Sequence, residues 1–231
     1  EWLPRAIAAA DPDPDGVAVW YLGCNGFVVR SPEATLYIDP YFGDGDPPTL
    51  LRMIPIPMDP ADATLCDGVL VTHEHLDHMH PPSFEPLLDD GGTVYAPWAS
   101  FAQPDYAGDI AVPNDQRSVI APSNSVTVGD LTVHVRGAHD PDAVEPVTYI
   151  VEHDEGTFFH GGDTKPSDDF AALGEEFDID VGVLAFGSDG RIAGENGPKP
   201  AHWYMSEDEV VAAANHLQLD RLIPSHWDIW R

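Results

Sequence analysis

Short apolar runs separated by turn residues dominate the first forty positions of the chain. The runs at 17–22, 26–30 and 35–39 each have the length of a strand, and Gly, Asn, Ser and Pro lie between them. Apolar runs of this length, bounded by turn residues, predict β-strands. The pattern therefore predicts a β-meander, preceded by a short helix or arm and a turn in residues 1–16.

The rest of the chain continues with strands and adds helices between them. Further strands are predicted at 68–71, 93–96, 118–121, 125–128, 131–138, 147–152, 157–160, 181–185 and 222–224. Helices are predicted at 83–88, 98–106 and 170–173, and after Ser206. Glu209 completes a capping box with Ser206, and an apolar stripe follows. Strands followed by helices, twice over, indicate two βα halves that pack sheet to sheet with the helices outside.

Residues 41–67 interrupt this alternation. The segment is rich in proline and reaches from the third strand to the fourth, with one apolar stretch at 50–54. Loops longer than about 12–15 residues in a compact domain are usually functional or disordered. The apolar stretch argues against disorder, so we predict a lid or an oligomer contact.

The excess of acidic residues predicts a strongly negative protein surface. The chain has 40 Asp and Glu against 10 Lys and Arg, a net charge of −30, and the acids are spread along its whole length. A uniform acidic coat is typical of a protein that stays soluble in high salt, where self-repulsion is screened. We therefore predict a halophilic, cytoplasmic protein, with steering of cationic partners as the alternative.

Composition also limits the partners. Phosphate backbones are bound by clustered Lys and Arg, so the scarcity of these residues predicts no nucleic-acid partner. No stretch approaches the roughly 20 apolar residues of a membrane span, which predicts no membrane insertion. The two cysteines, Cys24 and Cys66, are too few for a disulfide framework and are predicted to be reduced and buried.

The densest group of chemically active side chains is at 73–78, directly after the strand predicted at 68–71. It holds three histidines and two carboxylates. Imidazole and carboxylate suit zinc, manganese or iron. Without a partner, such a group would cost several kcal/mol of desolvation if it were buried. A solvated histidine-rich loop is the alternative, but clustered His and Asp are typical of metal sites.

Other potential ligands follow later strands. His139, Asp163 and His226 each come just after an apolar strand, and strand ends at one edge of an α/β fold converge where ligands bind. Asp140 neighbours His139 and could take its place. Asp39 ends the third strand, and it either supports a ligand or loop or caps a turn.

Two sets of motifs resemble a known family. His73-Glu74-His75-Leu76-Asp77-His78 resembles the H-x-H-x-D-H signature of the metallo-β-lactamase superfamily. Four further segments resemble the L-ascorbate 6-phosphate lactonase-like branch of that superfamily and suggest a haloarchaeal-type member. They are 21–26, 161–163, 205–206 and 223–230. The His-x-Asp-Ile-Trp sequence that starts at His226 is the most specific of these pieces.

The resemblance implies a fold and an activity. The fold is α/β, an αβ/βα four-layer sandwich formed by a single domain over residues 1–231. The activity is that of a metal-dependent hydrolase, in which a metal-bound hydroxide opens a small cyclic carboxylic ester, with or without a phosphate group. The implied cofactors are two divalent ions, zinc or manganese, with one ion as the alternative. The implied partners are a small-molecule substrate and further copies of the chain in a homo-oligomer.

The resemblance also assigns roles to individual residues. One ion would be held by His73, His75 and His139. The second would be held by Asp77, His78 and His226. Asp163 would bridge the two ions, and Asp77 would also act in catalysis by orienting the hydroxide or taking its proton. Candidates for binding a substrate phosphate are Arg191, Lys199 and Arg52, and supporting positions are assigned to Asp39 and Asp228.

Other functions remain as alternatives. One is a phosphodiesterase or nuclease of the same superfamily, which the missing basic patch argues against. Another is a diiron redox member, which usually carries Glu at the position of His75. The last is a non-catalytic module used for assembly. A scaffold has no need of an open metal site, so the full ligand set argues against it.

Overall fold

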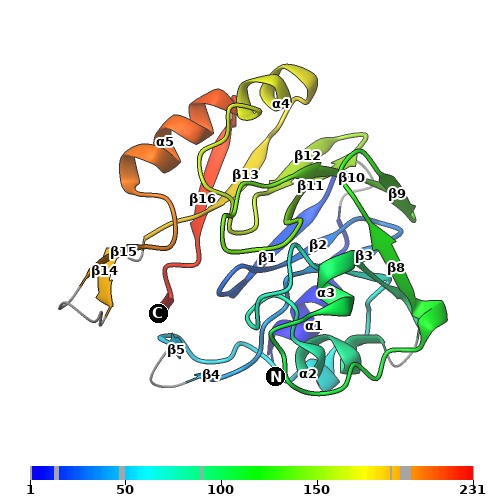
Figure 1. Cartoon of the computed structure of the whole chain (residues 1–231). Helices are drawn as coiled ribbons and strands as arrows, with labels where there is room; N and C mark the ends of the chain where they lie inside the picture. Colours follow the sequence, from blue (N-terminus) through cyan, green and yellow to red (C-terminus); the bar gives the residue numbers. More distant parts are fainter. Residues whose placement is uncertain are drawn as a thin grey trace.

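Two six-stranded sheets face each other at the centre of the fold (Figure 1). In sheet order, the first holds β1 (Ala18–Gly23), β2 (Gly26–Arg30), β3 (Thr35–Ile38), β6 (Gly68–Leu70), β7 (Thr93–Pro97) and β8 (Arg117–Ile120). The second holds β16 (Arg221–Ser225), β13 (Val181–Ala185), β12 (Gly156–His160), β11 (Val147–His153), β10 (Leu131–Gly137) and β9 (Ser125–Val128). The computed structural model describes residues 2–12, 16–46, 50–88, 91–187, 189–192 and 199–230.

Both sheets are built on the same plan. In the first, β1, β2 and β3 form an antiparallel meander, and β3, β6, β7 and β8 then run parallel. In the second, β9 to β12 are antiparallel, and β12, β13 and β16 are parallel. The repeated order of strands and helices in the sequence follows from this plan, because parallel neighbours need a crossover connection.

The helices cover the outer faces of the sheets (Figure 1). The first sheet is covered by α1 (Trp2–Ala9), α2 (Pro81–Phe84) and α3 (Trp98–Ala102), and the second by α4 (Phe170–Glu176) and α5 (Glu207–His216). Short 3₁₀ helices lie at Pro60–Asp62, Glu85–Leu88 and Asn114–Gln116. The result is the αβ/βα four-layer sandwich that the sequence predicted. Among the described residues, no helix is long and apolar enough to cross a membrane.

Alternation along the strands explains how the two sheets pack. On β10, Leu131, Val133 and Val135 are fully buried in the central core between the sheets. The side chains between them face the other way, and His134 contacts Ser125 and Glu152 there. A period of two places one apolar face against the opposite sheet, and this burial fixes the register of the strand.

The segment 41–67 contains two strands that the sequence did not predict. A small sheet joins β4 (Gly45–Asp46), β5 (Leu50–Arg52) and β17 (Ile229–Trp230). The Arg52 guanidinium donates to the carbonyls of Leu22 and Tyr41, both at 2.8 Å. This attaches the segment to the end of β1. Whether it acts as a lid or as an oligomer contact stays a prediction. The hairpin of β14 (Asp189–Ile192) and β15 (Lys199–His202) was not predicted either.

Candidate metal centre

Polar side chains gather where strands of both sheets end. The loop 73–78 follows β6 in the first sheet, and Asp163 and His226 follow β12 and β16. These last two strands run parallel to β13, one on each side of it. Asp140 lies in the loop that leaves β10. The carboxyl ends of parallel strands share one edge of a sheet, so the side chains converge at one end of the sandwich.

The first group of ligand atoms is formed by His73, His75 and Asp140. His73 Nε2 and His75 Nδ1 lie 2.8 Å apart, and Asp140 Oδ2 lies 3.9 and 3.8 Å from them. The outer ring nitrogens have partners of their own. His73 Nδ1 is 3.0 Å from the Thr72 hydroxyl, and His75 Nε2 is 3.3 Å from the carbonyl of Asp142.

The second group is formed by Asp77, His78 and His226. His226 Nε2 lies 3.3 Å from Asp77 Oδ2 and 3.4 Å from His78 Nε2. Asp163 connects the two groups. Its Oδ1 is 3.3 Å from both His78 Nε2 and His226 Nε2, while its Oδ2 is 4.0 Å from His73 Nε2. The carboxylate therefore presents one oxygen to each group.

Asp39 fixes the orientation of two residues at this centre, Thr72 and His78. It is fully buried, and its carboxylate accepts hydrogen bonds from Thr72 N at 2.8 Å and from Thr72 Oγ1 at 2.7 Å. His78 Nδ1 lies 2.8 Å from Asp39 Oδ2. A carboxylate in that position accepts the Nδ1 proton, so Nε2 is the ring nitrogen of His78 that faces the centre.

The arrangement of donors and acceptors in the first group fits a metal ion. The Thr72 hydroxyl donates to Asp39, so it accepts from His73 Nδ1, and the carbonyl of Asp142 accepts from His75 Nε2. These contacts place the lone pairs of His73 Nε2 and His75 Nδ1 against each other at 2.8 Å. Two facing acceptors repel unless a cation lies between them. Imidazole and carboxylate together suit zinc, manganese and iron.

The charges at the site are unevenly distributed. Burial lowers the pKa of His73 well below its ordinary value, and the neighbouring His78 lowers it further, so His73 is a neutral imidazole. Burial also opposes a charge on His78, but Asp163, Asp39 and Asp77 outweigh it and raise its pKa well above the ordinary value. Burial likewise opposes ionisation of Asp163, yet His226 and His78 hold its pKa below its usual range. The carboxylates thus create a negative field that favours a cation.

The structure brings most of the predicted site residues together, with one difference at the end of β10. His73, His75, Asp77, His78, Asp163 and His226 lie in the two groups. The side chain of His139 is exposed, and the described contacts of this residue are made by its backbone, to Thr164 Oγ1 and Lys165 N. Its neighbour Asp140, 9% exposed, faces the first group instead.

Two other predicted positions have different outcomes. Asp228 is fully buried and accepts hydrogen bonds from Cys24 N and from the Tyr21 hydroxyl, which holds the β1–β2 turn beside the centre. The backbones of Arg191 and Lys199 lie in β14 and β15, but their side chains are outside the described part of the chain.

Sequence reasoning missed the contribution of the β1–β2 turn and of His160. Asn25 donates to Asp163 Oδ1 at 3.4 Å and accepts from the Ser225 hydroxyl at 2.6 Å. His160, a strand histidine by sequence, is fully buried, with Nε2 2.8 Å from the carbonyl of Asn25. A Gly-Cys-Asn-Gly turn gives no local signal of this role, because the partners are far away in the sequence.

Comparison with known proteins identifies relatives. A family described as "Beta-lactamase superfamily domain" matches residues 34–227. The protein named "Probable L-ascorbate-6-phosphate lactonase UlaG" of Escherichia fergusonii is 26% identical over 275 aligned positions, covering 99% of this chain and 74% of that protein.

Solved structures share the fold. Igni18, a metallo hydrolase from Ignicoccus hospitalis, matches with a TM-score of 0.66 and 18% identity, over 91% of this chain and 82% of that chain. CmlA, a diiron β-hydroxylase from Streptomyces venezuelae, matches with a TM-score of 0.67 and 16% identity, over 94% of this chain and 46% of that one. The same fold therefore occurs in a protein described as a metallo hydrolase and in one described as a diiron β-hydroxylase.

Proposed function

The chain belongs to the beta-lactamase superfamily, and we propose that it is a metal-dependent hydrolase of the lactonase type. Its substrate would be a small cyclic carboxylic ester. The main support is the position of Asp163, whose two oxygens face two separate groups of imidazole and carboxylate ligands. The similarity of 99% of this chain to a protein named as a probable lactonase supports the choice of ester over phosphodiester. The acidic composition supports it too, since a nucleic-acid substrate requires clustered cations.

Two divalent ions, zinc or manganese, would be held by the two groups. The first would be held by His73, His75 and Asp140, and the second by Asp77, His78 and His226, with Asp163 shared. Asp140 replaces His139 in this assignment because its carboxylate, and not the imidazole of His139, faces His73 and His75. When bound, such ions supply an activated water and a Lewis acid that polarises the ester carbonyl.

The chain's own residues would position the reactants and move the proton. Asp77 is fully buried at the centre, with Oδ2 3.3 Å from His226 Nε2 and Oδ1 4.0 Å from His78 Nε2. Oδ2 would anchor the side chain, and Oδ1 would accept the proton of the attacking water and later return it to the leaving alkoxide. Asp39 and Asp228 would keep His78 and the β1–β2 turn in place.

Recognition of a phosphorylated substrate would depend on very few cations. We assign this role to Arg191 and Lys199, in the β14–β15 hairpin. A phosphate on the substrate is recognised by charge-assisted hydrogen bonds, so replacing both side chains by alanine would raise KM for a phosphorylated lactone and leave KM for an unphosphorylated one unchanged.

Metal content tests the assignment of the ligands. Wild-type protein purified in high salt is expected to hold two equivalents of zinc or manganese, and Asp140→Ala about one, because the first group loses a carboxylate. His139→Ala is the matched control, and it is expected to retain two. The measurement is elemental analysis of each protein after removal of free metal.

The opposite pattern of metal content would identify His139, and not Asp140, as the ligand. If His139→Ala lost an equivalent and Asp140→Ala did not, Asp140 would be no ligand. One equivalent in all three proteins would indicate a single-ion centre. A folded protein without metal would rule out the hydrolase mechanism and favour an assembly module.

The reaction class can be tested with two substrates. In molar KCl, hydrolysis of a chromogenic lactone is expected to exceed hydrolysis of bis(p-nitrophenyl) phosphate by at least about a hundredfold, a difference in transition-state stabilisation of about 2.7 kcal/mol. The reverse preference would identify a phosphodiesterase.

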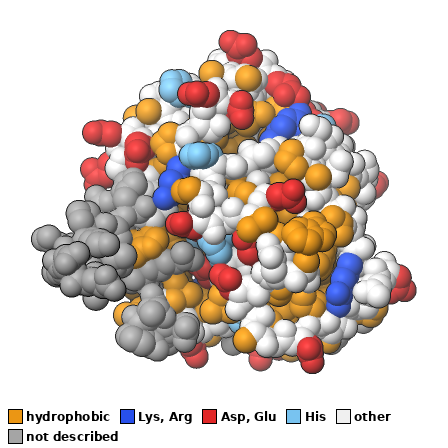
Figure 2. All heavy atoms as spheres, viewed as in Figure 1, with side chains coloured by type: hydrophobic (Ala, Val, Ile, Leu, Met, Phe, Trp, Pro, Cys, Tyr) orange, Lys and Arg blue, Asp and Glu red, His pale blue; other side chains and the backbone are white. Residues whose placement is uncertain are grey.

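Salt dependence tests the halophilic prediction. Figure 2 shows acidic side chains spread over the viewed face, with few Lys and Arg among them. At a net charge of −30, self-repulsion falls as the Debye length shortens from about 10 Å at 0.1 M salt to about 3 Å at 1 M. The melting temperature is therefore expected to rise by about 5 °C or more in molar KCl, a gain of about 2 kcal/mol. Thermal unfolding followed by circular dichroism measures this, and a Tm that is independent of KCl would contradict a halophilic surface.

A further inference from the structure

Cys24 occupies an unusual position in the β1–β2 turn. Its backbone has a φ of 56°, a conformation that non-glycine residues rarely adopt, and its side chain is fully buried. The turn is held from two sides. Cys24 N donates to both carboxylate oxygens of Asp228 at 2.9 Å, and its carbonyl accepts from His226 N at 2.8 Å and from the Tyr21 hydroxyl at 2.9 Å. These contacts fix where the sulfur points.

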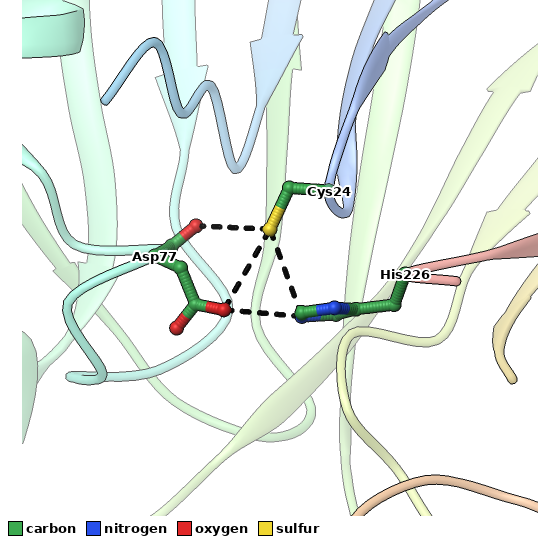
Figure 3. A group of neighbouring side chains, drawn as sticks. All are labelled: Cys24, Asp77 and His226. Carbon is green, nitrogen blue, oxygen red and sulfur yellow. Dashed lines mark hydrogen bonds and ion pairs between the residues drawn. The ribbon is translucent and has the colours of Figure 1, made fainter. Parts of the chain in front are cut away.

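The sulfur points at two members of the second ligand group (Figure 3). Cys24 Sγ lies 3.6 Å from Asp77 Oδ2 and 3.7 Å from His226 Nε2, and those two atoms are 3.3 Å apart. The ring of Tyr204 stacks on the ring of His226, with 4.1 Å between centroids, and so fixes its plane. Apolar packing against Tyr41 and Ile229 explains why Cys24 is buried. It does not explain why two polar ligand atoms surround the sulfur.

The three distances match the edges of one metal coordination sphere. Where two ligands of a zinc ion are about 109° apart, with sulfur at about 2.3 Å and nitrogen or oxygen at about 2.0–2.1 Å, their atoms are separated by about 3.6 Å on an edge with sulfur and about 3.3 Å on an edge without it. The observed separations of 3.6, 3.7 and 3.3 Å agree with these edges within a few tenths of an ångström. Three potential ligand atoms therefore lie at the spacing that one shared ion requires.

We propose that Cys24 is a thiolate ligand of the second ion and lies with Asp77 and His226 on one face of its coordination sphere, while His78 and Asp163 approach from the other side. This inference rests on the metal centre proposed above but not on the reaction. A thiolate is a soft ligand, which zinc accepts readily and manganese does not. Cys24 therefore makes the second group selective for zinc-like ions, whereas the first group, built from imidazole and carboxylate, lacks this preference.

Cobalt substitution tests the sulfur ligand directly. The metal-free full-length chain is titrated with Co²⁺ as wild type, Cys24→Ser and Cys66→Ser. Cys66 is the matched control: it is only partly buried, not buried as predicted, and its Sγ contacts the carbonyl of Gly68 on β6, away from both ligand groups. Wild type and Cys66→Ser are expected to show both visible ligand-field bands and a near-ultraviolet thiolate-to-cobalt charge-transfer band. Cys24→Ser is expected to keep the visible bands and lose the near-ultraviolet one.

Competition between metals gives a second readout. The preference of the second group for Zn²⁺ over Mn²⁺ is expected to fall by at least about tenfold in Cys24→Ser and to stay unchanged in Cys66→Ser. Cys24→Ala serves as a second variant, and circular dichroism checks that each variant is folded.

The outcomes separate this inference from the proposed function. Visible cobalt bands in wild type without a charge-transfer band would overturn the sulfur ligand and leave the hydrolase standing, and so would a charge-transfer band that persists in Cys24→Ser. A charge-transfer band in a protein that opens no lactone would support the ligand and overturn the reaction. Failure of wild type to take up cobalt would overturn both. A wild-type spectrum without the charge-transfer band overturns the sulfur ligand whether or not a variant folds, and Cys24→Ala repeats the assignment to Cys24 if Cys24→Ser does not fold.

Discussion

Replacement of Asp77 by asparagine is expected to lower kcat for lactone opening by about a thousandfold, with little change in KM. Asparagine has the same size and keeps one oxygen for the contact that Oδ2 makes with His226 Nε2. It cannot accept a proton, and the loss of a positioned general base costs about 10²–10⁴ in rate. The measurement is steady-state kinetics on a chromogenic lactone at saturating metal, with the metal content of each sample determined in parallel.

The comparison needs a variant that leaves the centre intact. His139→Ala serves this purpose, because its exposed side chain lies outside both ligand groups. It is expected to keep wild-type kcat. Retention of more than a tenth of the wild-type kcat by Asp77→Asn would contradict the proton-transfer role. If the variant lost rate only in proportion to lost metal, Asp77 would be a ligand and no more.

Replacement of Gly23 by alanine is expected to lower the free energy of unfolding by about 3 kcal/mol. Gly23 has a φ of +87°, and a Cβ there would lie 2.5 Å from an Arg52 guanidinium nitrogen and 2.9 Å from Asp228 Oδ2. The backbone conformation costs a residue with a side chain about 1–2 kcal/mol. Crowding adds about 1–3 kcal/mol, because Arg52 is held by the carbonyls of Leu22 and Tyr41 and Asp228 by the turn itself.

Gly187→Ala separates the two contributions. Gly187 has a similar φ of +95°, and a Cβ added to it meets no atom of the described residues within 4 Å. Its substitution is expected to cost only the backbone part, about 1–2 kcal/mol. Urea unfolding of both variants in the same salt measures the difference. Equal losses would show that crowding at Gly23 relaxes, and the two contacts with Arg52 and Asp228 would then contribute little to stability.

Local pattern was enough to predict most of the fold. Strands such as β10 alternate with a period of two, and α5 begins with a capping box at Ser206, so each is encoded within about ten residues. The small sheet could not be predicted in this way. Its pairing joins Ile229 to Arg52, and both strands are too short to show a period. Tertiary contacts, not local preference, determine that they are strands.

In the candidate site, too, some features follow from local sequence and others depend on tertiary contacts. The cluster at 73–78 is visible in the sequence because its ligands are neighbours. The choice between His139 and Asp140 is not, because β10 ends at Gly137 and alternation says nothing about the residues beyond it. Backbone hydrogen bonds of His139 with Thr164 and Lys165 decide which side chain faces the centre. Cys24 was predicted only to be buried, since Asp77 and His226 approach it from 53 and 202 positions away.

The position of Asp163 between the two ligand groups has a consequence for the order in which the molecule is assembled. His78 and His226 are 148 positions apart, and they belong to opposite halves of the sandwich. Closing a loop of that length costs entropy before any contact repays it. An ion held between the halves would act as a cross-link, and its binding energy would become part of the energy of folding. Uptake of the second ion would thus mark the moment at which the two halves of the sandwich dock against each other, and a chelator would act on the chain first by releasing one half from the other.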